Sequence, residues 1–301
     1  MKRFLAIMAA AIMLWPALAV AQTNQQQSRP ELFPYPTPPE GLTLLRERCN
    51  FLVYHFWDRA DLKKVFDRPE GLHAAFGDWV TFMPYCAADT AKLAIRNLLQ
   101  AVGKDGKKLV KVAQMAEYWT DSDSAEIVSE ELFAPFAAAV ATSKKVPEAD
   151  RRHFARQLHR INSSAMGQVL PALPYTAPDG TQRVLEQDTI NTMIVVADPE
   201  ATESTTASIR FSIDPATRLL VDEGMLRIAW FYPGDLTEVA AASLAKLPDN
   251  WITGVLPEVN EYFRPRMIPA VYLLDNKGRM ILKDRPYTMA LQVFNVMAAG
   301  E

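Results

Sequence analysis

The chain has 301 residues, of which 49% are hydrophobic and 22% are charged, an ordinary composition for a globular protein of one or two domains. The formal net charge of -3 leaves no basic footprint, so the composition argues against a nucleic-acid-binding protein. No apolar run after Ala21 is long enough to predict a membrane span. The remaining chain is long enough to bury a hydrophobic core without disulfides or metals.

The first 21 residues are typical of a secretory signal peptide. Lys2 and Arg3 give a positive start, residues 4–15 form an apolar stretch, and Ala19-Val20-Ala21 is a small-residue cleavage site. The alternative is an uncleaved anchor helix, but the stretch is shorter than the roughly 20 residues that span a bilayer. Pro16 also interrupts it. We therefore expect an exported protein, periplasmic or secreted, with no transmembrane segment after signal cleavage.

Changes in composition divide the rest of the chain into three regions. Residues 22–40 are rich in glutamine and proline, and such a run resists packing, which predicts a flexible-to-extended linker. From residue 41 to 165 the apolar residues recur with a helical period and no strand pattern intrudes, which predicts an all-α domain. In residues 170–301 short strands alternate with helices, which predicts an α/β sandwich with a mixed sheet.

Several local signals predict where the helices of the all-α region begin and end. Asp67 and Glu70 have the spacing of a capping box at the start of the second helix, and Pro84 ends that helix. Asp89 can cap the third helix, which Gly103 closes. The turn from Gly103 to Lys108 mimics half of a phosphate-binding loop, but it follows a helix and lacks the final Ser or Thr, so we expect an interhelical turn.

The carboxy-terminal region shows turn signals between extended runs. Two β-hairpins are expected, around Pro178-Asp179-Gly180 and around Asp275-Asn276-Lys277-Gly278. Continuous apolar strands are expected at residues 190–196 and 226–232, a short strand at 251–255, a helix at 205–222 interrupted at Pro215, and further helices at 236–247 and 291–297. This pattern predicts a sheet that is covered on both faces.

The order of these elements resembles the thioredoxin-like fold of exported thiol-disulfide oxidoreductases, over residues 173–298. The residues that carry the resemblance are the two hairpin turns, the strand and turn of Ile194–Asp198, and Ile268-Pro269-Ala270. With the helical region included, the chain resembles an uncharacterised family of exported bacterial proteins with an N-terminal helical domain and a C-terminal thioredoxin-like domain. In that family the turn after the strand commonly reads Asp-Pro-x-Cys-x-x-Cys.

The two cysteine positions of that turn are occupied by other residues here. Aligned on Asp198-Pro199, they fall on Ala201 and Ser204. Alanine has no nucleophile, and a serine hydroxyl is a poor one unless a base activates it. All four histidines lie in the helical half of the sequence, at positions 55, 73, 153 and 159. We therefore expect no catalytic residue, no cofactor and no thiol-disulfide oxidoreductase activity at this turn.

The Ile268-Pro269 dipeptide can have a binding function even though the turn lacks cysteines. The resemblance implies that Pro269 is cis, that it faces the degenerate turn, and that the preceding backbone can pair with an extended peptide. The alternative is a cis proline that only sets the turn before the next strand. On the first interpretation Glu200, Glu203, Ile268 and Pro269 are candidate docking residues for a protein or peptide partner in the cell envelope.

Two alternative functions remain. Cys49 and Cys86, which are 86 − 49 = 37 positions apart, can form a disulfide or remain two buried thiols, and a thiol-disulfide factor could use them. Glu200 and Glu203 could instead pair as acid and base in an unrelated enzyme, which predicts a pocket with convergent polar groups at that turn. No histidine or cysteine cluster has metal-ligand spacing, so no metal site is expected.

Overall fold

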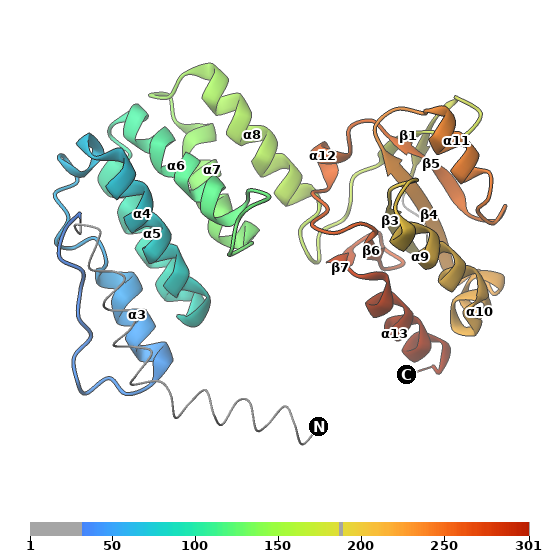
Figure 1. Ribbon diagram of the computed structural model, residues 1–301, viewed down its shortest axis with the longest axis horizontal. Coiled ribbons are helices and arrows are strands. Elements are labelled where there is room, and N and C mark those ends of the chain that lie inside the picture. Colours follow the sequence, from blue (N-terminus) through green and yellow to red (C-terminus); the bar gives the residue numbers. More distant parts are fainter. Residues whose placement is uncertain (1–31, 187–188, 301) are drawn as a thin grey trace. The chain divides into compact units, whose positions relative to one another are not determined.

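Figure 1 shows the computed structural model, which describes residues 32–186 and 189–300. The chain divides into two compact units, residues 1–136 and 137–301, within helix α7 (Glu130–Thr142). The expected signal peptide and residues 22–31 of the expected linker lie outside the described residues. Within the described ranges, no helix has both the length and the apolar character needed to cross a bilayer.

The first unit is helical, as the periodicity predicts. Its elements before α7 are α3 (Leu45–His55), η1 (Val65–Asp67), α4 (Pro69–Phe82), η2 (Met83–Tyr85), α5 (Ala88–Val102) and α6 (Gly106–Thr120). Helix α3 packs against α4 and α5, and α6 packs against the same two helices. The expected phosphate-loop mimic is an interhelical turn, in which Asp105 caps α6 by accepting hydrogen bonds from the amides of Lys107 and Lys108.

Buried aromatic rings form the centre of this unit. Phe76 and Trp79 lie on α4 and Phe56 follows α3, and all three are fully buried. The Trp79 indole nitrogen donates to the Val53 carbonyl oxygen over 2.9 Å, which satisfies the one polar atom of that ring. Gly77 lets the Trp119 indole lie directly on α4, because a Cβ atom at residue 77 would overlap that ring. These contacts explain why the helical stripes of the sequence converge on one core.

The end of the expected linker is part of this core, which corrects the expectation that residues 22–40 resist packing. Phe33 is only 6% exposed, and its ring lies 5.7 Å from the ring of Phe56 and 5.4 Å from that of Trp57. The Tyr35 hydroxyl donates to the Asp78 carboxylate over 2.8 Å. Proline-rich composition does not prevent packing when two aromatic side chains supply apolar area to bury. The packed chain therefore begins before Gly41.

Two expected helix caps are wrong. Asp67 lies in η1, so α4 begins at Pro69 after Arg68, which makes no side-chain cap. Proline at the first helical position needs no amide partner, and this removes the need for a capping box. Helix α5 begins at Ala88, so Asp89 lies inside its first turn, where its charge favours the helix dipole without capping it.

The second unit contains a seven-stranded mixed sheet, with α8 (Glu148–Ser163) at its amino-terminal end. The strands are β1 (Leu173–Thr176), β2 (Gln182–Leu185), β3 (Asn191–Val196), β4 (Leu226–Pro233), β5 (Ile252–Leu256), β6 (Ala270–Leu274) and β7 (Met280–Arg285). Their order is β2-β1-β5-β4-β3-β6-β7, with β3, β4 and β5 parallel and β6 antiparallel to β3. The predicted α/β sandwich with a mixed sheet is confirmed.

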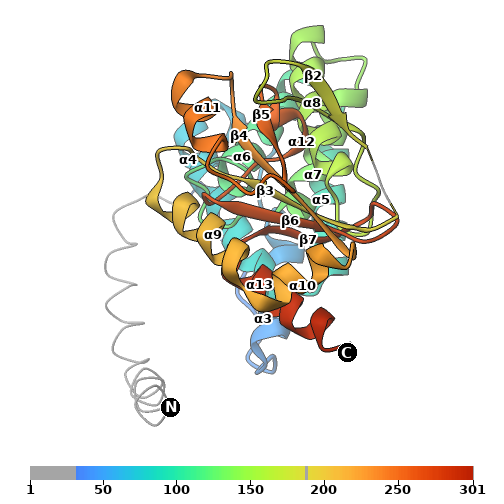
Figure 2. The same ribbon diagram turned by 90° about the vertical axis from the view of Figure 1, so that its right-hand side faces the viewer.

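Both faces of the sheet are buried, as the continuous apolar strands predict. On β3, Met193 and Val195 pack on one face, while Ile194 and Val196 pack on the other, because successive side chains alternate. The first face is covered by α9 (Thr202–Ile213), α10 (Pro215–Asp222), α11 (Glu238–Leu244) and α13 (Tyr287–Ala298). Figure 2 shows α9, α10 and α13 along one side of the sheet. On the other face lies α12 (Val259–Tyr262), against which α8 packs.

The local turn signals are confirmed. In the first hairpin Gly180 has φ +81°, a conformation that glycine adopts freely, and the Asp179 carboxylate accepts from the Thr181 amide over 2.9 Å. Pro215 ends one helix and begins another, because Asp214 caps α10 through the Thr217 amide. The last helix begins at Tyr287, four residues before the expected start, directly after Pro286.

Candidate functional site

The degenerate turn lies between β3 and α9. Ala201 is the N-cap of α9 and is partly exposed, whereas Ser204, at the third helical position, is 2% exposed. Glu200 directly precedes Ala201, Glu203 lies two residues after it, and both glutamates are exposed. The first cysteine position of the resembled motif is therefore open to a partner, and the second is buried behind it.

Ser204 closes the turn by a hydrogen bond. Its hydroxyl oxygen accepts from the Asp198 amide over 3.0 Å. The Asp198 carboxylate in turn accepts from the Glu200 amide over 2.8 Å, and the Asp198 carbonyl oxygen accepts from the Ala201 amide over 3.2 Å. These bonds hold residues 198–204 in one conformation without a thiol. A buried hydroxyl that is engaged in this way is poorly placed to act as a nucleophile.

The sheet register brings the Ile268 loop to the same place. Val196, the last residue of β3, pairs with Ala270, the first residue of antiparallel β6. The segment after Val196 and the segment before Ala270 therefore leave the sheet side by side. We call this margin, where β3, β4 and β5 end and β6 begins, the carboxyl edge. Candidate docking residues that are far apart in sequence thus lie at one edge.

The loop before β6 exposes apolar side chains. Met267 and Ile268 are each 37% exposed, whereas Pro269 is buried. The Ile268-Pro269 peptide bond is cis, as the resemblance implies. Among the described residues, neither Met267 nor Ile268 makes a backbone hydrogen bond. The loop therefore offers apolar surface together with backbone donors and acceptors.

Two groups at the carboxyl edge were not singled out from the sequence. The Asp284 carboxylate accepts from the Arg266 amide over 3.0 Å, so β7 anchors the loop two residues before Ile268. Burial raises the pKa of Asp284, although Arg266, Lys283 and Arg285 lower it in part. At the end of β4, burial raises the pKa of Tyr232, and the neighbouring Asp198 carboxylate raises it further. Of these two residues, only Asp284 has an unusual backbone conformation, with a positive φ of +51°.

Known proteins match both parts of the chain. Residues 18–164 match the family DUF5106, described as a domain of unknown function. A thioredoxin-like protein from Bacteroides caccae superposes with a TM-score of 0.66 at 21% identity, covering 89% of this chain and 99% of that one. The carboxy-terminal domain has a thioredoxin-like fold. The two-part resemblance drawn from the sequence is thereby confirmed.

Other solved structures match less than half of this chain. The thioredoxin domain of a thiol-disulfide oxidoreductase from Bacteroides vulgatus covers 44% of this chain and 99% of its own, at 14% identity and a TM-score of 0.34. A conserved protein of unknown function from Bacteroides fragilis covers 43% of this chain and 98% of its own, at 25% identity and a TM-score of 0.40. None of the curated proteins matches the chain significantly.

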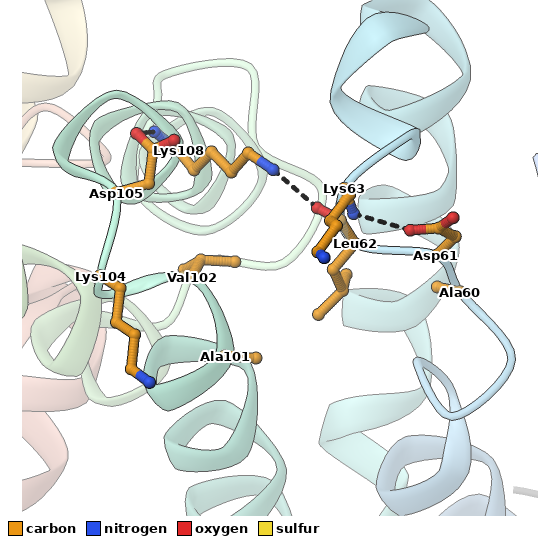
Figure 3. Close-up of a pocket in the computed structure, with 9 residues that line it drawn as sticks. All are labelled: Ala60, Asp61, Leu62, Lys63, Ala101, Val102, Lys104, Asp105 and Lys108. Carbon is orange, nitrogen blue, oxygen red and sulfur yellow. Dashed lines mark hydrogen bonds between the residues drawn. The ribbon is translucent and has the colours of Figure 1, made fainter.

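Two cavities are lined by residues outside the degenerate turn of residues 198–204. One, of about 540 Å³, is in the helical unit between residues 60–63 and 101–108 (Figure 3). Its Lys108 ammonium donates to the Leu62 carbonyl oxygen, and the Lys104 side chain points in a different direction, so the two cations do not converge. The other, of about 200 Å³, lies between α9, α10 and Trp251. Neither is lined by Glu200 or Glu203, so neither supports the enzyme alternative at that turn.

The structure brings together some of the expected site residues but not others. Ala201, Ser204, Glu200, Glu203, Ile268 and Pro269 share the carboxyl edge of the thioredoxin-like domain. Cys49 and Cys86 lie in the helical unit, and both are free thiols in the structure. Within residues 32–186 and 189–300, no group of three or more histidine, cysteine or acidic residues is arranged to hold a metal ion.

Proposed function

We propose that this chain is a redox-inactive, thioredoxin-like binding protein of the cell envelope, which holds an extended peptide at the carboxyl edge. The observation that carries the proposal is the pairing of Val196 with Ala270, which sets a turn without thiols beside the exposed Ile268 loop. The site has the position of a thioredoxin-like active site and retains surface for binding, but it lacks the reacting atoms.

The absence of thiols supports redox inactivity. Disulfide exchange requires a thiolate that attacks a disulfide sulfur and forms a mixed disulfide. Residues 137–301 contain no cysteine, so no thiolate can arise within this domain. Ala201 stands at the partly exposed position from which such an attack would start, and the buried Ser204 hydroxyl accepts a hydrogen bond from the Asp198 amide.

The backbone of the Ile268 loop supports peptide binding. Its unpartnered backbone groups can pair with an extended peptide in the way that a strand is added to a sheet edge. The exposed side chains of Met267 and Ile268 supply an apolar contact beside those groups. Main-chain pairing gives affinity in this mode of recognition, and side-chain contacts give specificity.

The charge of the turn favours a basic peptide. Asp198, Glu200 and Glu203 are all exposed, and they surround the amino terminus of α9. A helix amino terminus carries only about half a positive charge, so three carboxylates leave this part of the edge negative. Arg266, two residues before Ile268, interacts with the Asp284 carboxylate. We therefore expect a peptide that places a basic side chain near the turn and an apolar side chain against Ile268.

A display library of random peptides tests the binding function directly. The purified protein is expected to enrich peptides that combine basic and apolar residues, and Ile268→Asp and Glu203→Lys are each expected to weaken binding by about tenfold or more. Ile213→Asp, at the opposite end of α9, and Glu223→Lys, at the end of α10, are the matched controls. The absence of any enriched sequence, or equal losses in the controls, would refute peptide binding at this edge.

The proposed location rests on the first 21 residues. Cell fractionation is expected to find the protein in the periplasm or the medium, and its intact mass is expected to lack residues 1–21. Retention of these residues in a membrane fraction would favour the anchor-helix alternative instead.

A further inference from the structure

The only two cysteines of the chain are neighbours in the helical unit. Cys49 lies on α3, Cys86 directly follows η2, and α3 packs against η2. The Ala87 amide donates to the Asn50 side-chain oxygen over 2.7 Å. Because Asn50 follows Cys49 and Ala87 follows Cys86, this bond holds the two cysteine-bearing backbones side by side.

The two thiols differ in their exposure to solvent. Cys49 is 3% exposed, whereas Cys86 is partly exposed and its thiol donates to the Met83 carbonyl oxygen over 3.2 Å. Burial raises the pKa of both thiols, and Cys49 itself contributes to the rise at Cys86, so the two groups are close enough to interact. A raised pKa lowers the thiolate fraction, which argues against a catalytic pair and suits a structural one.

We propose that Cys49 and Cys86 form a structural disulfide when the chain meets an oxidising compartment, with glutathione disulfide or a protein disulfide as the oxidant. This proposal does not depend on the peptide-binding function, because it concerns the helical unit alone. It assigns to these cysteines a stabilising role, in place of the catalytic role that a thiol-disulfide factor would require.

Access sets the order of the two exchange steps. With glutathione disulfide, the Cys86 thiol loses its proton and attacks one sulfur, so a Cys86–glutathione bond forms and one glutathione leaves as a thiol. The Cys49 thiol then loses its proton and attacks the Cys86 sulfur, which releases the second glutathione. Overall the two protein thiols are oxidised to one disulfide, and glutathione disulfide is reduced to two glutathione molecules.

The bridge would close a segment that contains η1, α4 and η2. A loop of this length restricts the unfolded chain substantially, provided that the bond does not strain the folded unit. The oxidised helical unit is therefore expected to melt roughly 10 °C above the reduced one.

The test uses the purified full chain, reduced and then exposed to glutathione disulfide before alkylation in denaturant and measurement of intact mass. The wild type is expected to lose two hydrogen atoms, to resist alkylation and to remain a monomer on a non-reducing gel. Two alkylated cysteines, two glutathione adducts, or disulfide-linked dimers would each overturn the proposal.

A matched pair of variants tests the order of the steps. Cys49→Ala is expected to stop at a single glutathione adduct on Cys86, since no second thiol can displace it. Cys86→Ala is expected to remain unmodified, because the remaining thiol is buried. Equal adduct formation on both variants would contradict the assignment of Cys86 as the first thiol to react. The wild-type mass stays informative even if either variant fails to fold.

Discussion

In this protein the thioredoxin-like fold and the cysteine thiols lie in different units. In the thioredoxin-like domain a strand, a turn and a helix resemble those of a redox site, but Ala201 and Ser204 carry no sulfur. The helical unit carries both thiols of the chain on elements that resemble no redox motif. The position of a site within a fold therefore predicts where a partner binds, and only the residues present decide whether a reaction follows.

The largest expected change in activity comes from placing two cysteines in the turn. We expect Ala201→Cys with Ser204→Cys, made with Cys49→Ala and Cys86→Ala, to reduce an insulin disulfide more than about tenfold faster than the rate without protein. The first thiol would lie at the amino terminus of α9, where the helix dipole favours the thiolate, and the second would lie behind it.

The control for that gain is Ala201→Cys alone in the same background. A single thiol forms a mixed disulfide but has no partner to resolve it, so multiple turnovers are not expected. If the folded variant with cysteines at both 201 and 204 shows no turnover, the surrounding scaffold, and not only the turn, has lost redox competence.

A smaller effect, on stability, is expected from removing the Ser204 hydroxyl. Ser204→Ala removes the acceptor of the Asp198 amide and is expected to lower the free energy of unfolding of the domain by about 1–2 kcal/mol. Hydrogen exchange at the Asp198 amide should accelerate, because its only acceptor in the turn is lost. Ser208→Ala, which removes a partly exposed hydroxyl that donates to the Thr205 carbonyl oxygen within the same helix, is the control and should change the stability little. Equal effects of the two variants would show that the hydroxyl does not hold the turn.

The smallest effect concerns the anchor of the Ile268 loop. Because burial raises the pKa of Asp284 in the folded state, the stability that this carboxyl group contributes is present below its ordinary pKa and is lost as the pH rises through the raised value. Asp284→Asn keeps an acceptor for the Arg266 amide and suits a positive φ. It is expected to raise the stability at pH 7 by less than about 1 kcal/mol, and the gain should vanish in acid.

Asp179→Asn in the first hairpin is the control, because its effect on stability is expected to depend on pH in the opposite direction. Hydrogen bonds from the Thr181 side chain and amide lower the pKa of Asp179, so its contribution is present above its ordinary pKa and is lost in acid. Urea unfolding between pH 3 and pH 7 measures both variants. A stability gain for Asp284→Asn that persists at low pH would contradict the assigned role of its charge.

Local sequence signals were sufficient for the fold. The continuous apolar run of β3 predicts a strand covered on both faces, and the Asp-Gly and Asn-Lys-Gly turns predict the two hairpins, because these signals act within a few residues. The empty turn and the Ile268-Pro269 dipeptide were visible for the same reason. From the sequence, only the resemblance indicated that the turn and the dipeptide lie at the same edge of the sheet. The register of β3 and β6 shows this directly.

Contacts between distant residues were not visible in the sequence. Asp284 lies 18 positions from Arg266, and nothing near either residue indicates that they are bonded. The packing of Phe33 against Phe56 was hidden by the prolines around it. The same limit applies to Cys49 and Cys86, whose spacing is compatible with a bridge but cannot show that α3 lies beside η2.

The most direct test of a thioredoxin-like domain without thiol chemistry is the disulfide-reductase rate of the unmodified chain. Insulin reduction with dithiothreitol is measured for the wild type and for Cys49→Ala with Cys86→Ala, each against a reaction without protein. We predict that both rates equal the background rate, because the carboxyl edge has no nucleophilic sulfur. Catalysed turnover that persists in the cysteine-free variant would contradict the account.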